Sequence, residues 1–253
     1  MISVILAIVV GLSGFATAHY AVGAGIGWSV FLAIIGFAAF QAIFGYLIRK
    51  RITRDMEKVQ SILMAGQKQI QAKTQRWQMR PPSSIQEAQR EIFADTKVFV
   101  REALKQTEEL AKYRLWVPMI RRQMATAQLQ LSWMIKDFKT VDKLFPKAIL
   151  LDPTLVAMKM ARMYMLNEET DAIGKVYRKA VRRLRYNQNV LLAATWSWIL
   201  IQRNDSDGAF KALTEALRKS DNETLKRNHE VLMNNRVAHF NNSGLGDVWY
   251  SLL

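Results

Sequence analysis

Two long runs of apolar residues open the chain, and no charged side chain interrupts them. The first 48 residues contain no Asp, Glu, Lys or Arg. A soluble domain rarely leaves such a stretch uncharged, because its surface positions need polar groups. The second run, residues 28–48, would form about 31 Å of helix at ~1.5 Å per residue, which matches a hydrocarbon core of ~30 Å. The first run, residues 2–18, is at the short end of the spanning range, and alternating glycines between the runs favour a turn. We therefore predict a two-helix transmembrane hairpin over residues 1–48.

The charges that follow the second run predict the orientation of this hairpin. Arg49, Lys50, Arg51 and Arg54 come directly after it, whereas the turn between the runs carries no positive charge. By the positive-inside bias, the Arg49 end and the rest of the chain lie in the cytoplasm. The same four side chains are the predicted contacts for anionic lipid headgroups. An alternative is a signal peptide cleaved after Ala18, at a small-x-small site, although no basic residue precedes the first run. Pairs of small residues four apart would let the helices approach closely: Ala7/Gly11, Gly14/Ala18 and Ala38/Ala42.

Apolar residues at helical spacing then predict a neck of two helices over residues 49–118. The first helix carries an apolar stripe of residues seven apart, interrupted at Gly66: Met56, Leu63, Ile70 and Trp77. Pro81 and Pro82 break the neck, and Ser84 with Glu87 forms a capping box that starts the second helix. We expect this helix to run to about Tyr113 and to bury six residues: Ile85, Ala88, Ile92, Phe99, Ala103 and Leu110. Pro118 marks the next break.

From Met119 onward, helices of about a dozen residues alternate with short polar turns, and no stretch has the pattern of a β-strand. The turns are predicted at residues 136–137, 151–153, 167–169, 187–189 and 204–207. Within the second helix of each pair, a large residue precedes an alanine by three: Phe145/Ala148, Tyr177/Ala180 and Leu213/Ala216. The three alanines lie 32 and 36 residues apart, close to a period of ~34. The first helix of each pair carries small residues: Ala125, Ala157 with Ala161, and Ala193 with Ser197.

This pattern resembles the tetratricopeptide repeat (TPR) family, whose 34-residue helix-turn-helix units stack into a right-handed solenoid. The resemblance covers about residues 120–220, and it departs from the family in three ways, the first of which is a spacing that varies by two residues around the period. Only the first unit is closed by a proline, Pro153, and no unit has a glycine at its inter-helix turn. The resemblance implies an all-α fold in which residues 119–253 form a TPR-like α-solenoid with a capping helix at 223–240. The apolar tail at residues 244–253 follows a glycine stop, and we expect it to dock on the last hairpin. The alternative is an unrelated helical bundle whose small residues permit close packing.

The resemblance also implies a groove for a partner protein, because TPR proteins hold ligands on a concave face lined by the first helix of each pair. Carried over by position, this face presents eight residues: Gln130, Trp133, Met158, Arg162, Met165, Ala194, Trp198 and Gln202. Trp, Met and Arg are the residue types that anchor peptides at interfaces. The two tryptophans would equally suit the core of the domain.

Composition and spacing exclude several kinds of site. The chain has no cysteine, which excludes disulfides and thiolate metal sites, and its three histidines are not at ligand spacing. We find no phosphate-binding glycine loop after a strand. The adjacent pairs Glu108/Glu109 and Glu168/Glu169 point to different sides of a helix, so they do not form an acid/base couple. We therefore predict that the protein is not an enzyme and that it uses no metal or cofactor. The net charge of +15 suits anionic lipid or an acidic protein, while the basic cluster at residues 178–185 lacks the aromatics that nucleic-acid bases would stack on.

Together these patterns predict a multi-pass protein of a bacterial-type inner (plasma) membrane with the bulk of its chain in the cytoplasm. Its expected role is that of an adaptor or scaffold that binds a partner protein at the cytoplasmic membrane face. The alternative is an accessory or structural subunit of a larger membrane complex, docked through the transmembrane hairpin. The identity of the partner, and whether the chain also associates with itself, are left open by the sequence.

Overall fold

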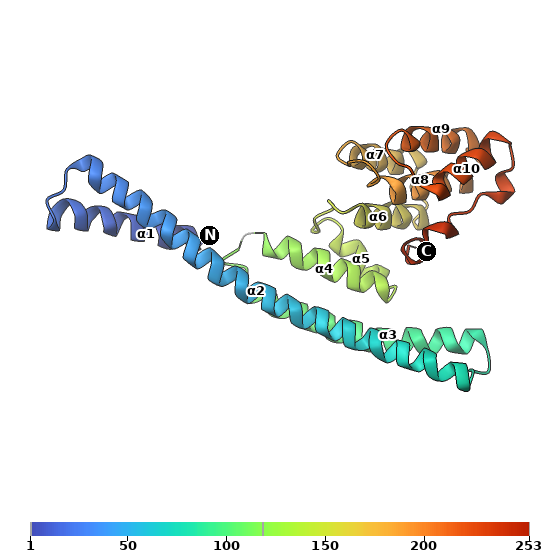
Figure 1. Ribbon diagram of the computed structural model, residues 1–253, viewed down its shortest axis with the longest axis horizontal. Coiled ribbons are helices and arrows are strands. Elements are labelled where there is room, and N and C mark those ends of the chain that lie inside the picture. Colours follow the sequence, from blue (N-terminus) through green and yellow to red (C-terminus); the bar gives the residue numbers. More distant parts are fainter. Residues whose placement is uncertain (1, 118, 253) are drawn as a thin grey trace. The chain divides into compact units, whose positions relative to one another are not determined.

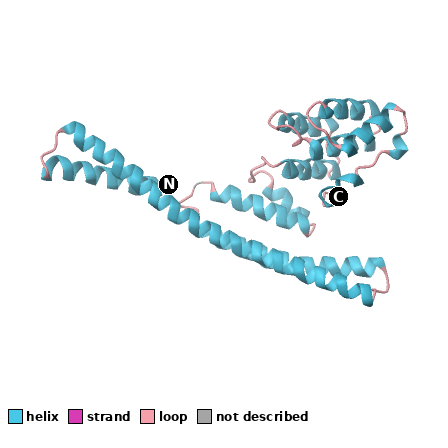
Figure 2. Ribbon diagram, in the orientation of Figure 1, coloured by secondary structure: helices cyan, strands magenta, loops and turns pink. Residues whose placement is uncertain are grey.

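The computed structural model describes residues 2–117 and 119–252, which fold mainly into helices (Figure 2). No β-strand occurs within these ranges, so the predicted all-α class is confirmed. The chain divides into two compact units, Met1–Ala148 and Ile149–Leu253. The first predicted helix pair after residue 119 therefore belongs to the first unit. Pro118, the predicted break, lies outside the described residues.

The first unit begins with two helices that pack against each other. Helix α1 (Ile2–Ala16) continues as a π-helical turn, η1 (Thr17–Ala21), and helix α2 starts at Ile26 (Figure 1). Ala7 and Gly11 are buried in the contact, and a Cβ added to Gly11 would lie 3.2 Å from the carbonyl oxygen of Ala33. Small side chains therefore set the close approach of α1 to α2. Ala18, the cleavage position in the alternative signal-peptide interpretation, is helical and buried.

Helix α2 (Ile26–Met79) is one uninterrupted element of 54 residues. At ~1.5 Å per residue it is about 81 Å long, so the predicted second span and the predicted first neck helix are a single rod. No proline lies between Ile26 and Met79, and the basic residues that follow the apolar part are good helix formers.

Helix α3 (Ile85–Glu108) returns antiparallel along the second half of α2 (Figure 1). The predicted capping box is present: the Ser84 hydroxyl accepts a hydrogen bond from the Glu87 amide at 3.1 Å, and the Glu87 carboxylate accepts one from the Ser83 amide at 3.1 Å. The bond to Ser84 satisfies an amide group that the first turn of a helix leaves without an intrahelical partner, and the bond from Ser83 holds the residue that precedes the cap. Lys73 on α2 forms ion pairs with Glu91 and Asp95 on α3, both at 2.8 Å.

The packing of α2 on α3 confirms part of the predicted core and corrects the rest. Phe99, Ala103 and Leu110 are buried as predicted, and the ring of Phe99 lies directly over Gly66 of α2. Ile85 was predicted to be buried but is 79% exposed, because it lies in the first turn of α3 beside an equally exposed end of α2. Ala88 and Ile92 are half-buried. The helix also ends earlier than predicted, at Glu108, and tightens into a 3-10 turn, η2 (Glu109–Tyr113).

Helices α4 (Ile120–Met134) and α5 (Phe138–Leu144) complete the first unit. The second unit contains α6 (Pro153–Met165), α7 (Thr170–Val181), α8 (Val190–Gln202), α9 (Ser206–Leu217) and α10 (Glu223–Met233). Consecutive helices pack as the pairs α6/α7 and α8/α9, and α8 also contacts α6 and α10. The predicted capping helix at 223–240 is shorter than expected, because α10 ends at Met233 and is followed by a 3-10 turn, η3 (Val237–His239).

One turn geometry recurs where α4, α6, α8 and α10 end. Lys136, Asn167, Asn204 and Asn235 all have a positive φ, between 53° and 59°. In each case the amide of that residue bonds to the carbonyl three positions back, and the next amide bonds to the carbonyl five positions back. This is the Schellman motif, which asparagine can form without glycine because it tolerates the left-handed region. The missing inter-helix glycines of the sequence are thereby explained, and the four turns lie 31, 37 and 31 residues apart.

Candidate functional site

Two packed helices of the second unit carry six of the eight predicted partner-binding residues. Met158, Arg162 and Met165 lie on α6, and Ala194, Trp198 and Gln202 lie on α8. The structure therefore brings these six together on neighbouring helices, although Ala194 is fully buried. The other two, Gln130 and Trp133, lie on α4 in the first unit.

The exposure of these side chains separates accessible residues from core residues. Trp133 is only 4% exposed and packs edge-on against Phe138, with 5.4 Å between ring centroids. Met158 is 7% exposed, so both side chains contribute to packing, which is the alternative considered for Trp133. Met165 and Gln202 are exposed, whereas Gln130, Arg162 and Trp198 are half-buried. The accessible part of the predicted groove in the second unit is therefore the end of α6 and α8 around Met165 and Gln202.

A cluster of aromatic rings joins α6 and α8 to the C-terminal segment. Trp198 packs edge-on against Tyr164 at 5.1 Å and against Trp249 at 5.9 Å between centroids. Arg203 lies over the Tyr164 ring at 5.5 Å and donates a hydrogen bond to the carbonyl of Glu168 at 3.3 Å. Arg203 was not among the predicted site residues, since its position after α8 has no distinguishing pattern in the sequence.

The C-terminal segment is docked on α8, as the sequence analysis predicted. Trp249, in the short helix α11 (Asp247–Tyr250), is 6% exposed, and Leu252 is 1% exposed. The Asn242 side chain donates to the carbonyl of Ala194 at 3.0 Å and accepts from the Asn228 amide at 2.7 Å. Because Asn242 and Asn228 are both buried, their bonded amides fix the segment against the helical core. The docked segment packs against Trp198 through Trp249, so the chain's own C-terminal residues cover part of the surface of Trp198.

A second cluster, which the sequence analysis missed, lies on α2 just after the basic residues. Asp55 is 1% exposed and is surrounded by three donors: Lys112 at 2.7 Å, the Tyr113 hydroxyl at 2.9 Å and Lys58 at 3.2 Å. The hydrogen bond from Lys112, aided by those from Tyr113 and Lys58, lowers the pKa of Asp55 to about 2 in spite of its burial. Burial and the nearby Asp55 raise the pKa of Tyr113. An aspartate that follows a run of basic residues is the only sequence signal, and it does not reveal the partners 57 and 58 positions away.

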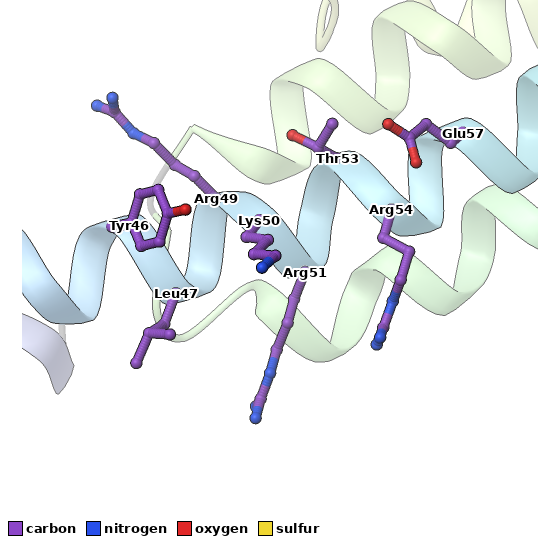
Figure 3. Close-up of a pocket in the computed structure, with 8 residues that line it drawn as sticks. All are labelled: Tyr46, Leu47, Arg49, Lys50, Arg51, Thr53, Arg54 and Glu57. Atoms are coloured by element: carbon purple, nitrogen blue, oxygen red, sulfur yellow. The ribbon is translucent and has the colours of Figure 1, made fainter.

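The four predicted headgroup contacts lie on different sides of α2, within the six residues that precede Asp55. Arg49, Lys50, Arg51 and Arg54 are all exposed. Figure 3 shows Arg51 and Arg54 extending to one side of α2 and Arg49 to the opposite side. Tyr46 and Leu47 lie beside them at the end of the apolar part of the helix (Figure 3). The cationic side chains are therefore accessible to an anionic surface or ligand.

Within residues 2–117 and 119–252, no three His, Asp or Glu side chains gather in a way that could hold a metal ion. No family model, curated protein or solved structure matches this chain. The function must therefore be argued from the apolar hairpin, the paired helices and the accessible side chains themselves.

Proposed function

We propose that the protein is a membrane-anchored adaptor, in which the α1–α2 hairpin inserts into a bacterial-type inner membrane and TPR-like helix pairs bind a partner protein at the cytoplasmic face. The observation that carries the proposal is the recurrence of one Schellman turn at the ends of α4, α6, α8 and α10. A repeated turn at a spacing near 34 residues supports a repeat architecture of the TPR kind. In such an array the first helices of successive pairs lie next to each other, as α6 and α8 do here.

Membrane insertion is supported by the surface of the two N-terminal helices. The structure has two helices long and apolar enough to cross a membrane, Ile2–Ala21 and α2, and only 17% and 6% of their apolar windows are buried within the described chain. A core helix of a soluble protein would be mostly buried, so these helices need another apolar environment. The exposed cations from Arg49 to Arg54 at one end favour insertion with that end in the cytoplasm.

Partner binding is supported by what remains accessible on α6 and α8. Met165 is 37% exposed and Gln202 is exposed, and they lie on the same two helices as Tyr164 and Trp198, whose rings pack edge-on. A flexible thioether beside a rigid aromatic group is a common anchor for a peptide side chain. The net charge of +15 favours a partner segment that carries acidic residues.

The experiment compares groove variants with outer-face variants of the full chain, isolated from membranes in mild detergent. Met165→Ala combined with Gln202→Ala should lose the co-purifying protein while the melting temperature stays within about 2 °C, because exposed side chains contribute little to stability. Lys175→Ala combined with Lys179→Ala, on exposed positions of α7, is the matched control and should retain it. Retention of the same protein by the groove variant would refute the groove. Trp198→Ala is unsuitable, because removing a ring packed between two others costs about 3–5 kcal/mol.

A second candidate, an accessory subunit docked through the hairpin, is favoured by one feature of α2. Ala38 and Ala42 are both exposed, so this pair of small residues is not used in the contact with α1. Such pairs allow another membrane helix to approach closely. Ala38→Leu combined with Ala42→Leu should then abolish a stoichiometric complex that the groove variants leave intact. The adaptor proposal expects the opposite: the partner is lost with Met165→Ala and Gln202→Ala, and it is retained with Ala38→Leu and Ala42→Leu.

A further inference from the structure

A small cleft lies where the apolar part of α2 meets its basic residues. Its volume is about 240 Å³, and it is lined by six residues: Phe44, Leu47, Ile48, Arg51, Tyr113 and Trp116. The first four share one face of α2, because residues three, four and seven apart coincide on a helix of 3.6 residues per turn. Tyr113 and Trp116 come from the segment that follows α3. The Phe44 and Trp116 rings are 5.2 Å apart between centroids, which forms the apolar wall of this Trp116 cleft.

The wall formed by residues 113–116 is held in place from two sides. On the α1 side, the amide of Ile2 donates to the carbonyl of Leu115 at 3.2 Å, and the Ser3 hydroxyl donates to the carbonyl of Trp116 at 3.4 Å. On the α2 side, the Tyr113 hydroxyl donates to Asp55 at 2.9 Å. These contacts tie the segment to both apolar helices, so the Trp116 cleft is formed before any ligand arrives.

The rim of the cleft is cationic, while its floor is apolar. Arg51 is exposed at the rim, and Arg54 extends to the same side of α2 (Figure 3). Asp55 lies one turn further on the same helix face, but its carboxylate already accepts from Lys112 and Lys58. Because Asp55 is buried and paired, it does not offset the charge that Arg51 presents to a ligand.

We propose that the Trp116 cleft is a binding site for one anionic phospholipid, with part of an acyl chain packed against the Phe44–Trp116 ring pair and the phosphate held by Arg51 beside Arg54. The proposal rests on insertion of the hairpin in a membrane. A cleft of about 240 Å³ lies below the ~300–1,000 Å³ of most pockets for compact ligands, and it suits one chain better than a metabolite. Its floor continues the exposed apolar surface of α2, where Leu47 is 50% exposed, so a lipid can enter sideways from the bilayer. A guanidinium binds phosphate through paired hydrogen bonds, and aromatic residues such as Tyr113 and Trp116 are enriched at the interface.

This arrangement gives the four basic residues unequal roles. All of them attract an anionic surface, but only Arg51 lines the cleft. Arg49 is two positions from Arg51, about 200° around the helix, and it extends to the opposite side of α2 in Figure 3. The site therefore requires Arg51 in particular, whereas a diffuse attraction would depend on the number of charges and not on their positions.

The test uses the full chain, delipidated in a non-ionic detergent and titrated with phosphatidylglycerol, phosphatidylcholine or inorganic phosphate, with bound lipid counted by native mass spectrometry. We expect one tightly bound phosphatidylglycerol, and Arg51→Gln should weaken it about ten- to a hundredfold, as for a lost charge-assisted pair. Leu47→Trp, which fills the cleft at an exposed position, should weaken it similarly. The matched control is Arg114→Gln, which removes the same charge from an exposed residue next to the cleft wall and should change the affinity less than about threefold.

Several results would overturn the site. One is an equal loss of affinity for phosphatidylglycerol in Arg51→Gln and Arg114→Gln. The others are an affinity for phosphatidylcholine equal to that for phosphatidylglycerol, and competition by inorganic phosphate at the same concentration as the lipid. Extraction of the same variants from membranes with alkaline carbonate separates the two proposals. A chain that is extracted contradicts the membrane anchor, whereas a chain that stays in the membrane but retains no lipid contradicts the Trp116 cleft alone.

Discussion

Replacing Gly66 by alanine tests whether close packing or helix propensity controls the neck. In an exposed helix the change would stabilise the protein by about 1 kcal/mol, because alanine is the better helix former. Here Gly66 is buried in α2, and an added Cβ would overlap the ring of Phe99, which is itself 8% exposed and enclosed by Val59, Val100 and Leu131. Overpacking of this kind costs about 1–3 kcal/mol. The two effects leave a net destabilisation of about 0–2 kcal/mol, or a fall of up to ~8 °C in melting temperature for a unit of this size.

Thermal unfolding of the full chain in mild detergent, followed by circular dichroism, provides the measurement. Phe99→Leu alone should destabilise by roughly 1–2 kcal/mol, less than the ~3–5 kcal/mol of a Phe→Ala change. When Gly66→Ala is combined with Phe99→Leu, the methyl group of the new alanine occupies space that the Phe99 ring leaves. The two changes should therefore couple favourably by about 1–3 kcal/mol. A Gly66→Ala variant that melts higher than the parent, or two changes that simply add, would show that the ring does not require glycine there.

Three further outcomes follow from the local geometry. Asp55→Asn should destabilise the chain by about 2 kcal/mol at neutral pH, because the folded-state pKa of about 2 lies below the ordinary 3.8. The contribution of Asp55 is present above the ordinary pKa and is lost as pH falls through the lowered one, so the variant should lose less stability between pH 5 and 2 than the parent does. Lys136→Gly should raise stability by about 0.5–1 kcal/mol, since φ is 56° there, whereas Lys139→Gly inside α5 should lower it by about as much. A single cysteine at Ser83, in a chain without native cysteines, should resist an impermeant thiol reagent in intact cells, and labelling before lysis would contradict the orientation.

The elements that the sequence predicts well are those with a strong local signal. The two apolar helices, the break at Pro81 and Pro82, and the Ser84 capping box are all present, because each depends on residues close together in the chain. The predicted turns of the second half are also present, and within them Lys136, Asn167 and Asn204 adopt the left-handed conformation that ends a helix. What the local pattern cannot show is where a long helix continues. The change from apolar to charged residues at Arg49 marks a change of environment, but it does not break a helix. The predicted boundary between span and neck at residues 48 and 49 is therefore not a boundary between helices.

The register of the groove was harder to predict, because α8 carries no periodic signal. Six consecutive residues from Leu192 to Ser197 are all buried, so no single face of this helix is marked by polarity. The position of Trp198 therefore came from the family pattern alone, which does not show that Trp249 packs against it. Trp133 illustrates the same problem, since a tryptophan on a helix suits either a core or a groove. Its contact with Phe138 depends on the turn at Lys136, which folds α5 back onto α4.

The continuity of α2 changes what the neck can do. From Asp55 to Met79 the helix extends about 36 Å, and α3 returns along it until Lys112 reaches Asp55 again. The chain therefore leaves the apolar hairpin and comes back to its base before α4 begins, so the neck cannot serve as a spacer between the hairpin and the helices that follow. Asp55 stabilises this arrangement, because its carboxylate accepts hydrogen bonds from Tyr113 and Lys112 at the end of the neck and from Lys58 at its start. Because the same contact positions Tyr113 in the wall of the Trp116 cleft, the base of the neck joins the apolar hairpin, the Trp116 cleft and the start of α4 in one packed region.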